Sequence, residues 1–336
     1  MRPSFYPRLV NGPFEDPGLF IPFQFENRAV LFDLGEIGAL SPRDILKISH
    51  VFVSHTHMDH FIGFDRLLRL FLGRGKSLFL YGPEGFLKNI EGKLAGYSWN
   101  LVENYDKRFL LKVFEVRSEG VLSRSYACAD RFSPAFPLER TSFNNRVLRE
   151  PAFEISVEIL DHGIPCLGFS LKEQFHINIK KDAVIALGLE IGPWLQEFKK
   201  MLYRQSVPET ETVISAGNGV KFDPADLADK IAVITPGQKI TYITDVAYDG
   251  TNPENIIQFA ERSDCLFLEA AFLEKDRDIA ARKRHLTARQ AGEIAGKSGA
   301  GMFQIFHFSP RYAGMGDLLY REARQAYLEN LTPRPA

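Results

Sequence analysis

The chain has 336 residues, of which 45% are hydrophobic and 25% charged, and its formal net charge at pH 7 is −1. This composition is typical of a globular protein, and the length suits one large domain or two modest ones. A near-neutral chain lacks the overall basic excess of many polyanion-binding proteins. A nucleic-acid substrate would therefore require a local basic face.

The cysteines and the N-terminal residues indicate in which cellular compartment the protein is expected. Cys128, Cys166 and Cys265 are an odd, widely spaced set, which argues against a disulfide framework and for a reducing compartment. Residues 1–27 contain five prolines and no continuous apolar run of the kind found in a secretory signal. No stretch approaches the roughly 18 apolar residues of a membrane span. We expect a cytoplasmic protein that does not cross a membrane.

Apolar, β-branched and aromatic runs that end at polar residues predict strands in both halves of the chain. In chain order these runs are 28–35, 48–54, 77–82, 239–245, 264–269 and 302–309. Apolar residues at helical spacing predict a helix over 59–72. Thr287 and Gln290, placed as a capping box, predict another over 287–297. The alternation predicts an α/β sandwich of two sheets covered by helices.

Two regions interrupt this alternation. Residues 117–151 are polar and irregular, and residues 174–220 include the glycine-containing run ALGLEIGPW at 186–194. Long insertions of this kind are more often excursions from a core than parts of it.

Residues 55–60, with the sequence HTHMDH, follow a predicted strand directly and hold three of the eight histidines. Side chains alternate along extended backbone, so His55 and His57 point the same way and can chelate one metal ion. Asp59 and His60, at the start of the next helix, can reach a second ion. One surface histidine is usually an ordinary polar residue, but this spacing predicts a metal site. Imidazole and carboxylate are the ligands expected for zinc, with manganese or iron also compatible.

Four residues cannot close two catalytic metal sites, so further ligands are required. His162 follows the strand-like run 153–160, Asp245 ends the run KITYITD and His307 ends MFQIFH. Functional groups in α/β sheets are usually presented at the carboxyl ends of strands. Considered alone, each of these residues would more often have no metal-binding role. Because the chain also contains HTHMDH, all three are favoured as ligands.

The order HxHxDH, then His, Asp and His, resembles that of the metallo-β-lactamase fold, and further motifs resemble the tRNase Z (ribonuclease Z) family within it. These motifs cover most of the chain from about residue 28: LFDLG at 31–35, VSHTHMDHFIGF at 53–64, LYGPEG at 80–85, LDHGIPCLGFSL at 160–171, LGLEIGP at 187–193, EAAF at 269–272, HLTARQA at 285–291 and HFSPRY at 307–312. The resemblance implies a four-layer αββα sandwich. It also implies a single domain over 1–336 with an inserted arm at about 174–220.

The resemblance further implies a division of the ligands between two zinc ions. The first group is His55, His57 and His162, and the second is Asp59, His60 and His307. Asp245 would bridge the two ions. Asp33 would order the HxHxDH loop from behind the ligands. From the residues alone, Asp33 is equally well explained as a turn-initiating Asp before Gly35.

The resemblance also assigns catalytic roles. Asp59 would orient the attacking water, and His285 would donate a proton to the leaving 3′-oxygen while Glu269 orients its ring. Without the resemblance, His285 is better explained as a surface histidine beside a helix N-cap. We interpret His50, in the middle of a predicted strand, as structural, and His176, in the candidate arm, as an exposed side chain.

The implied function is endonucleolytic removal of the 3′ trailer from precursor tRNA, in a homodimer whose arm reaches the partner's active site. Several features depart from this expectation. The residues beside Asp245, Glu269 and His285 differ from the family's usual motifs, which leaves the metal ligands in place but bears on the substrate. Residues 1–20 do not align with the family's Pro/Arg-bearing loop, and residues 172–204 hold six Lys/Arg against four Asp/Glu, a weak bias for a phosphate-binding arm. A lid or a dimer contact therefore stays open for the arm. A small-molecule phosphodiesterase or other ester hydrolase stays open for the activity. A catalytically silent binding module is a further alternative, against which the complete ligand set argues.

Overall fold

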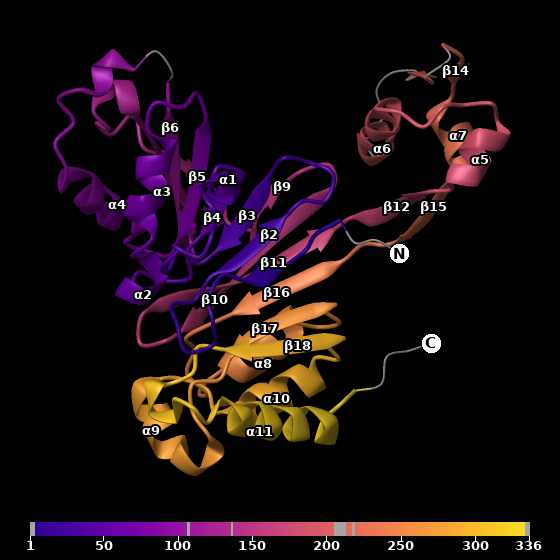
Figure 1. Ribbon diagram of the computed structural model, residues 1–336. Helices are drawn as coiled ribbons and strands as arrows, with labels where there is room; N and C mark the ends of the chain where they lie inside the picture. Colours follow the sequence, from indigo (N-terminus) through magenta and orange to yellow (C-terminus); the bar gives the residue numbers. More distant parts are fainter. Residues whose placement is uncertain (1–3, 106–107, 136, 205–212, 217–218, 333–336) are drawn as a thin grey trace.

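The computed structural model describes residues 4–105, 108–135, 137–204, 213–216 and 219–332. Two sheets lie face to face at the centre of the molecule (Figure 1). Within the described residues, the first sheet has eight strands in chain order: β1 (Arg8–Leu9), β2 (Leu19–Pro22), β3 (Ala29–Phe32), β4 (Ile48–Phe52), β5 (Ser77–Gly82), β6 (Leu110–Arg117), β7 (Gly120–Ala127) and β8 (Glu139–Thr141). Strands β3 to β6 run parallel, and the outer strands pair antiparallel.

The second sheet has six described strands, in the order β18 (Met302–Phe306), β17 (Cys265–Glu269), β16 (Lys239–Ile243), β11 (Pro165–Glu173), β10 (Phe153–Asp161) and β9 (Arg146–Arg149). Strands β16, β17 and β18 are parallel, whereas β9, β10, β11 and β16 pair antiparallel. The carboxyl ends of β16, β17 and β18 therefore lie along one edge. The tip of the β10–β11 hairpin lies at the same edge, because β11 pairs antiparallel with β16.

Strands of both sheets are apolar on both faces, as expected for sheets that are covered on each side. Along β4, Phe52 faces the second sheet, whereas Val51 and Val53 face the outer helices. The layer between the sheets is filled by large side chains, including Phe32 and Phe169, whose ring centroids are 5.2 Å apart.

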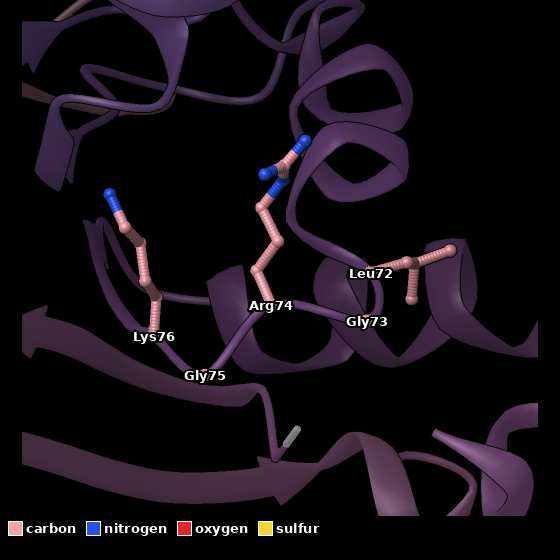
Figure 2. Close-up of a pocket in the computed structure, with 5 residues that line it drawn as sticks. All are labelled: Leu72, Gly73, Arg74, Gly75 and Lys76. Atoms are coloured by element: carbon pink, nitrogen blue, oxygen red, sulfur yellow. The ribbon is translucent and has the colours of Figure 1, made fainter. Parts of the chain in front are cut away.

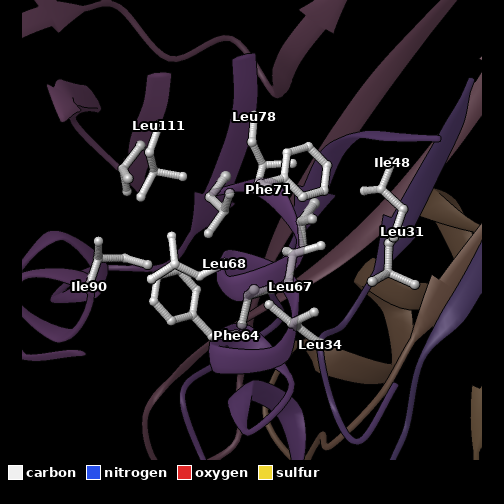
Figure 3. Close-up of a cluster of buried hydrophobic side chains, with 14 of the residues drawn as sticks. Leu31, Leu34, Ile48, Phe64, Leu67, Leu68, Phe71, Leu78, Ile90 and Leu111 are labelled. Carbon is white, nitrogen blue, oxygen red and sulfur yellow. The ribbon is translucent and has the colours of Figure 1, made fainter. Parts of the chain in front are cut away.

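Helices cover the outer face of the first sheet: α1 (Pro42–Ile45), α3 (Phe64–Phe71) and α4 (Phe86–Ala95). Figure 3 shows Phe64, Leu67, Leu68 and Phe71 of α3 pointing into a cluster with side chains of the strands. These α3 residues recur at helical spacing, so one face of the helix is buried.

The second sheet is covered by α8 (Asn252–Phe259), α10 (Ala288–Lys297) and α11 (Gly316–Glu329), while α9 (Arg277–Lys283) lies toward one end of this layer (Figure 1). The predicted capping box at Thr287 and Gln290 is confirmed at the start of α10. The layers are thus helix, sheet, sheet, helix, and the predicted αββα sandwich is confirmed.

Between β11 and β16 the chain leaves the sandwich and forms a projection, residues 175–236, which we call the arm (Figure 1). Its stalk is the antiparallel pair β12 (Phe175–Ile179) and β15 (Ala232–Pro236). Its head contains α5 (Lys181–Ala186), α6 (Trp194–Arg204), β13 (Ile214–Ser215), β14 (Lys221–Phe222) and α7 (Pro224–Ile231). The head has its own buried core, which includes Phe198 and Leu227. The interval expected from sequence, about 174–220, omits α7 and the returning strand; positions 205–212 and 217–218 of that interval lie outside the described residues.

Two predicted elements are wrong. The single helix expected over 59–72 is two helices, α2 (Met58–Phe61) and α3, with Gly63 between them. A Cβ on Gly63 would lie 2.2 Å from the carbonyl oxygen of Gly35, so the close approach of these two segments requires glycine. The region 117–151, expected to be irregular, contains β7, β8 and β9, whose mixed burial hides the period-two pattern.

No helix in the described part of the chain is long and apolar enough to span a bilayer. The three cysteines form no disulfide.

Candidate metal centre

Three acidic or histidine residues at strand ends share an unusual backbone conformation. Asp33, Asp245 and His307 follow β3, β16 and β18, with φ values of 58°, 43° and 62°. This left-handed region is uncommon for residues other than glycine, and such strain is found mainly at functional sites. The turn at each strand end aims a functional side chain along the shared edge of the two sheets.

The HTHMDH segment supplies the side chains that face Asp245 and His307. Strand β4 delivers the chain to His55, and His57 is the N-cap of α2, which carries Asp59 and His60. The ring centroids of His55 and His57 are 4.4 Å apart, and those of His55 and His60 are 4.1 Å apart. The rings of His55 and His60 are completely buried.

Asp245 lies at the centre of the cluster. Its Oδ2 is 3.3 Å from Nε2 of His60 and 3.6 Å from Nε2 of both His55 and His162. Its Oδ1 is 3.2 Å from Nδ1 of His307. One carboxylate thus faces four histidines that come from three separate segments of the chain.

The structure brings all seven predicted ligand residues together, in overlapping groups whose potential ligand atoms lie within 4.8 Å of one another. These groups are His55, His57, His162 and Asp245; Asp59, His60 and His307; and Asp245, Glu269, His285 and His307. The first two groups correspond to the division expected from sequence. The third group was not predicted from the sequence. It places His285 and Glu269 within reach of the Asp245 carboxylate.

Unpaired buried nitrogens show how these residues fit a metal. Within the described residues, Nε2 of His55, Nε2 of His60 and Nδ1 of His307 are buried and have no hydrogen-bond partner. A buried polar atom without a partner is costly unless something else satisfies it. Because all three nitrogens face carboxylate oxygens too far away or poorly placed for a hydrogen bond, divalent cations bound between them would satisfy both partners.

The ionisation of the cluster agrees with that arrangement. Burial, helped by the nearby His60, lowers the pKa of His55 to about 2, so this ring is neutral and its lone pair is available. Burial alone would raise the pKa of Asp245, but His307 and His60 hold it well below its usual value. For His60, burial opposes a charge, yet Asp245 and Asp33 together raise its pKa well above normal. These carboxylates favour a positive charge at that position, which a metal ion can supply in place of the proton.

Asp33 supports the loop from behind. Its carboxylate accepts hydrogen bonds from Nδ1 of His60 (2.9 Å), the backbone N–H of Ser54 (2.6 Å) and the hydroxyl of Tyr242 (2.9 Å). The Ser54 hydroxyl also donates to Asp33, which leaves its oxygen to accept from Nδ1 of His55 at 3.1 Å. These bonds direct Nε2 of both rings toward Asp245. Asp33 is therefore more than a turn residue; sequence reasoning missed Ser54 and Tyr242.

His162 is fixed in the same way by another segment. It lies in the β10–β11 turn, and its Nδ1 donates to the backbone carbonyl of Arg284 at 2.8 Å. The Arg284 side chain contacts the Asp161 carboxylate at 3.3 Å. A carbonyl partner leaves no signal in the sequence, so this link could not be predicted.

His285 and Glu269 form a hydrogen-bonded pair beside the cluster. Nδ1 of His285 donates to Oε2 of Glu269 at 3.1 Å and lies 4.0 Å from Oδ1 of Asp245. The other Glu269 oxygen accepts the backbone N–H groups of Val246 (2.8 Å) and Leu286 (3.3 Å). Because Glu269 is buried and engaged on both oxygens, it is better suited to orient His285 than to bind a metal. Burial lowers the pKa of His285, but Glu269 outweighs it and raises the pKa to about 9.

Asp59 lies at the more open side of the cluster. Nε2 of His307 donates to its Oδ2 at 3.2 Å. Burial would raise the pKa of Asp59, but this hydrogen bond and the neighbouring His60 lower it to about 2. A pocket of about 270 Å³ opens beside Asp59, His285 and His307.

A larger hollow, of about 750 Å³, lies elsewhere, at the loop from Leu72 to Lys76 (Figure 2). None of the described residues that line it carries a carboxylate or an imidazole. Its two cations already donate to backbone carbonyls, Arg74 to Leu70 and Lys76 to Leu46. The described lining of this hollow therefore supplies no metal ligand of the carboxylate or imidazole type.

His50 and His176 lie outside the metal cluster and are buried among other side chains. His50 is buried and stacks on Phe79, with ring centroids 4.8 Å apart. His176, expected to be exposed, is instead buried at the base of the arm, where its Nδ1 lies 3.1 Å from the Ser4 hydroxyl and 3.2 Å from Glu173.

Comparison with known proteins places this cluster in a family. No protein-family model matches the chain. The ribonuclease Z of Pyrococcus horikoshii is 30% identical over 310 residues, which cover 87% of this chain and 81% of that protein. The chain belongs to the ribonuclease Z family. The ribonuclease Z of Deinococcus radiodurans is also similar, at 28% identity over 286 residues that cover 84% of this chain and 83% of the relative.

A solved structure confirms the fold. The metallo-β-lactamase fold protein YhfI from Bacillus subtilis matches with a TM-score of 0.54 and 16% identity, over 96% of this chain and 94% of that one. Both the predicted family and the predicted fold are therefore confirmed.

Proposed function

We propose that this member of the ribonuclease Z family is a dinuclear zinc phosphodiesterase that cleaves precursor tRNA at its 3′ end. The observation that carries the proposal is the position of Asp245 between two groups of histidines, with the hydrogen-bonded pair of His285 and Glu269 beside it. Family membership supports RNA as the substrate, and the motif resemblance supports precursor tRNA in particular.

We assign the ligands by the two groups described above. One ion would be held by His55, His57 and His162, the other by Asp59, His60 and His307, with Asp245 shared. Imidazole with carboxylate favours zinc, and manganese or iron would also be accepted by these donors. When bound, such a pair of ions supplies a water acidified toward neutral pH and Lewis-acid polarisation of a phosphoryl oxygen.

The chain's own residues supply the proton transfers. The ionised Asp59 carboxylate, open on one side, accepts a hydrogen bond from the attacking water and orients it toward phosphorus. The protonated His285 ring, held by Glu269, gives a proton to the 3′-oxygen as the P–O bond breaks. The products are a 3′-hydroxyl on the upstream fragment and a 5′-phosphate on the trailer.

We further propose that the whole chain is one domain and that the arm contacts RNA outside the metal centre. The arm leaves the far end of β11 from His162, and nine strand residues separate them by about 30 Å. In Figure 1 the head of the arm points away from the body. An arm so placed would contact RNA that is bound at the metal centre of a partner subunit rather than at its own, which supports a homodimer.

One observation favours the alternative, a small-molecule phosphodiesterase or other ester hydrolase. The arm exposes apolar side chains, including Ile185, Ile191 and Ile234, each at least half exposed. A surface that follows a phosphate backbone would be expected to be basic. Such an arm would serve better as a protein contact or a lid.

The deciding experiment is a cleavage assay on a precursor tRNA with a 3′ trailer, with zinc or manganese added and the cut site mapped. The proposal predicts one cut at the 3′ end of the tRNA body, leaving a 3′-hydroxyl. Turnover of bis(p-nitrophenyl) phosphate without RNA cleavage would favour the alternative. Light scattering would measure the oligomeric state.

A further inference from the structure

The pocket beside Asp59, His285 and His307 is lined by residues of the motifs at 269–272 and 307–312 and also by residues 14–16 and Lys283, which belong to no motif. Its lining includes three aromatic side chains, Phe14, Phe272 and Phe308, and the cationic side chain of Lys283. Its volume of about 270 Å³ is below the roughly 300–1,000 Å³ of pockets that enclose whole drug-sized ligands. The pocket is therefore of the size of one planar ring with its sugar.

Phe14 is held firmly in place. It follows Pro13, whose carbonyl accepts the backbone N–H of Phe308 at 2.7 Å, directly after the ligand residue His307. The rings of Phe14 and Phe308 meet edge to face, with centroids 5.3 Å apart. Phe308 is buried, whereas Phe14 is only half-buried. Phe14 therefore presents an aromatic surface to the pocket from a loop fixed to the metal centre.

Lys283 supplies the positive charge. It is the last residue of α9, two positions before His285, and it is exposed. Among the residues the structure describes, no carboxylate pairs with its ammonium group. The acids at the pocket, Glu15 and Asp16, accept the backbone N–H groups of Gly12 (2.7 Å) and Glu36 (3.1 Å). A phosphate group would be repelled by these two carboxylates and attracted to the ammonium group of Lys283. This charge difference would favour one orientation of an RNA strand in the pocket.

We propose that this pocket is a nucleotide subsite, in which a base lies against Phe14 and Lys283 binds the adjacent backbone phosphate. Since His285 lines the pocket and would protonate the 3′-oxygen, the bound nucleoside is the one on the 5′ side of the cut. Aromatic side chains accept any base, because every base has a π face. The inference rests on the proposed phosphodiesterase function and adds substrate-positioning residues to it.

The first test concerns the charge. Lys283→Gln should lower the ratio of kcat/KM for RNA to that for bis(p-nitrophenyl) phosphate by about 5- to 10-fold, and reduce the salt dependence of RNA binding by about one counterion. Lys283→Arg should restore the ratio. Lys275→Gln, an exposed lysine near the start of α9 that does not line the pocket, is the matched control and should match the wild type.

The second test concerns the base. An RNA with an abasic site on the 5′ side of the cut should be cleaved about 10-fold less efficiently by the wild type. Phe14→Leu keeps an apolar side chain against Phe308 but removes the planar ring. This variant should cleave the normal and the abasic RNA at similar rates, because the stacking is already lost.

The outcomes are distinguishable. If the wild type cleaves RNA but ignores the abasic site, or if Lys283→Gln equals Lys275→Gln, the subsite is wrong while the proposed function stands. If the wild type hydrolyses the small ester and no RNA, the proposed function and the subsite both fail.

Discussion

His285 and Glu269, 16 residues apart in sequence, are joined by a 3.1 Å hydrogen bond from Nδ1 to Oε2, and Glu269 is completely buried. The carboxylate thereby fixes the tautomer and orientation of the ring and favours its protonated form. A protonated His285 can donate its proton to the leaving group, so its contribution to the rate should depend on how basic that leaving group is.

His285→Ala should lower kcat for RNA by about 10²- to 10⁴-fold, because a 3′-alkoxide leaves poorly without a proton donor. Turnover of bis(p-nitrophenyl) phosphate should fall much less, since p-nitrophenolate needs no proton. Metal content, measured by elemental analysis, should stay at the wild-type level. An equal loss on both substrates, or a loss of metal, would show that His285 is a ligand as part of the third group.

Asp33→Asn should weaken metal binding by about 10- to 100-fold, because the hydrogen bond to His60 loses its charge. Competition with a chromogenic chelator measures this affinity. Tyr242→Phe, which removes only the phenol–Asp33 hydrogen bond, is the graded control and should have a smaller effect. Unchanged affinity in Asp33→Asn would return Asp33 to a turn-forming role.

His50 should make the fold sensitive to acid. Burial, helped by Arg28, lowers its pKa to about 4 from an ordinary value of 6.5. The unfolded chain therefore takes up a proton as the pH falls through 6.5, while the folded chain does not until about 4. Stability is complete above pH 6.5 and is lost as the pH falls toward 4, by roughly 2 kcal/mol at pH 5.

Urea unfolding at pH 7.5 and 5 checks this, with wild type and His50→Phe both in excess chelator so that the cluster histidines contribute equally. The phenylalanine keeps a ring against Phe79 and does not titrate. The loss of unfolding free energy between the two pH values should shrink by roughly 2 kcal/mol in the variant. The same loss in both proteins would contradict the assignment.

Phe198→Ala tests the arm. Phe198 is completely buried in the separate core of the arm, and its truncation should cost roughly 3–5 kcal/mol of local stability. Hydrogen exchange should show lost protection in α6 and α7, with the sandwich unaffected. If the arm binds RNA, cleavage of precursor tRNA falls while small-ester turnover persists. Undiminished tRNA cleavage with an unfolded arm would rule out that role.

The metal cluster was predictable because its residues stand at ends of apolar strands. Asp245 and His307 end short apolar runs of a composition and length typical of buried strands, and parallel strands bring such ends to one edge. The HTHMDH spacing itself predicts two ligand groups. Family resemblance was needed for His285, because a single histidine before a helix carries no chemical signal of its own.

Other features depend on long-range contacts that leave no local pattern. The apolar spacing over 59–72 continues through Gly63 and gives no sign of the helix break there, where the backbone of Gly35 approaches closely. His176 is buried, and its Nδ1 contacts the hydroxyl of Ser4, 172 positions away in the sequence. Phe14 belongs to a stretch that aligns with no family motif, and its place at the pocket comes from a backbone hydrogen bond between Pro13 and Phe308.

The most direct test of the dinuclear centre is metal analysis of wild type and Asp245→Asn purified side by side. Asparagine tolerates the left-handed backbone at this position, so the variant should fold, as circular dichroism would verify. We predict about two divalent ions per wild-type chain, and fewer than one in the variant, with loss of phosphodiesterase turnover. An active wild type without bound metal, or a variant that keeps both ions and full turnover, would contradict the shared role of Asp245.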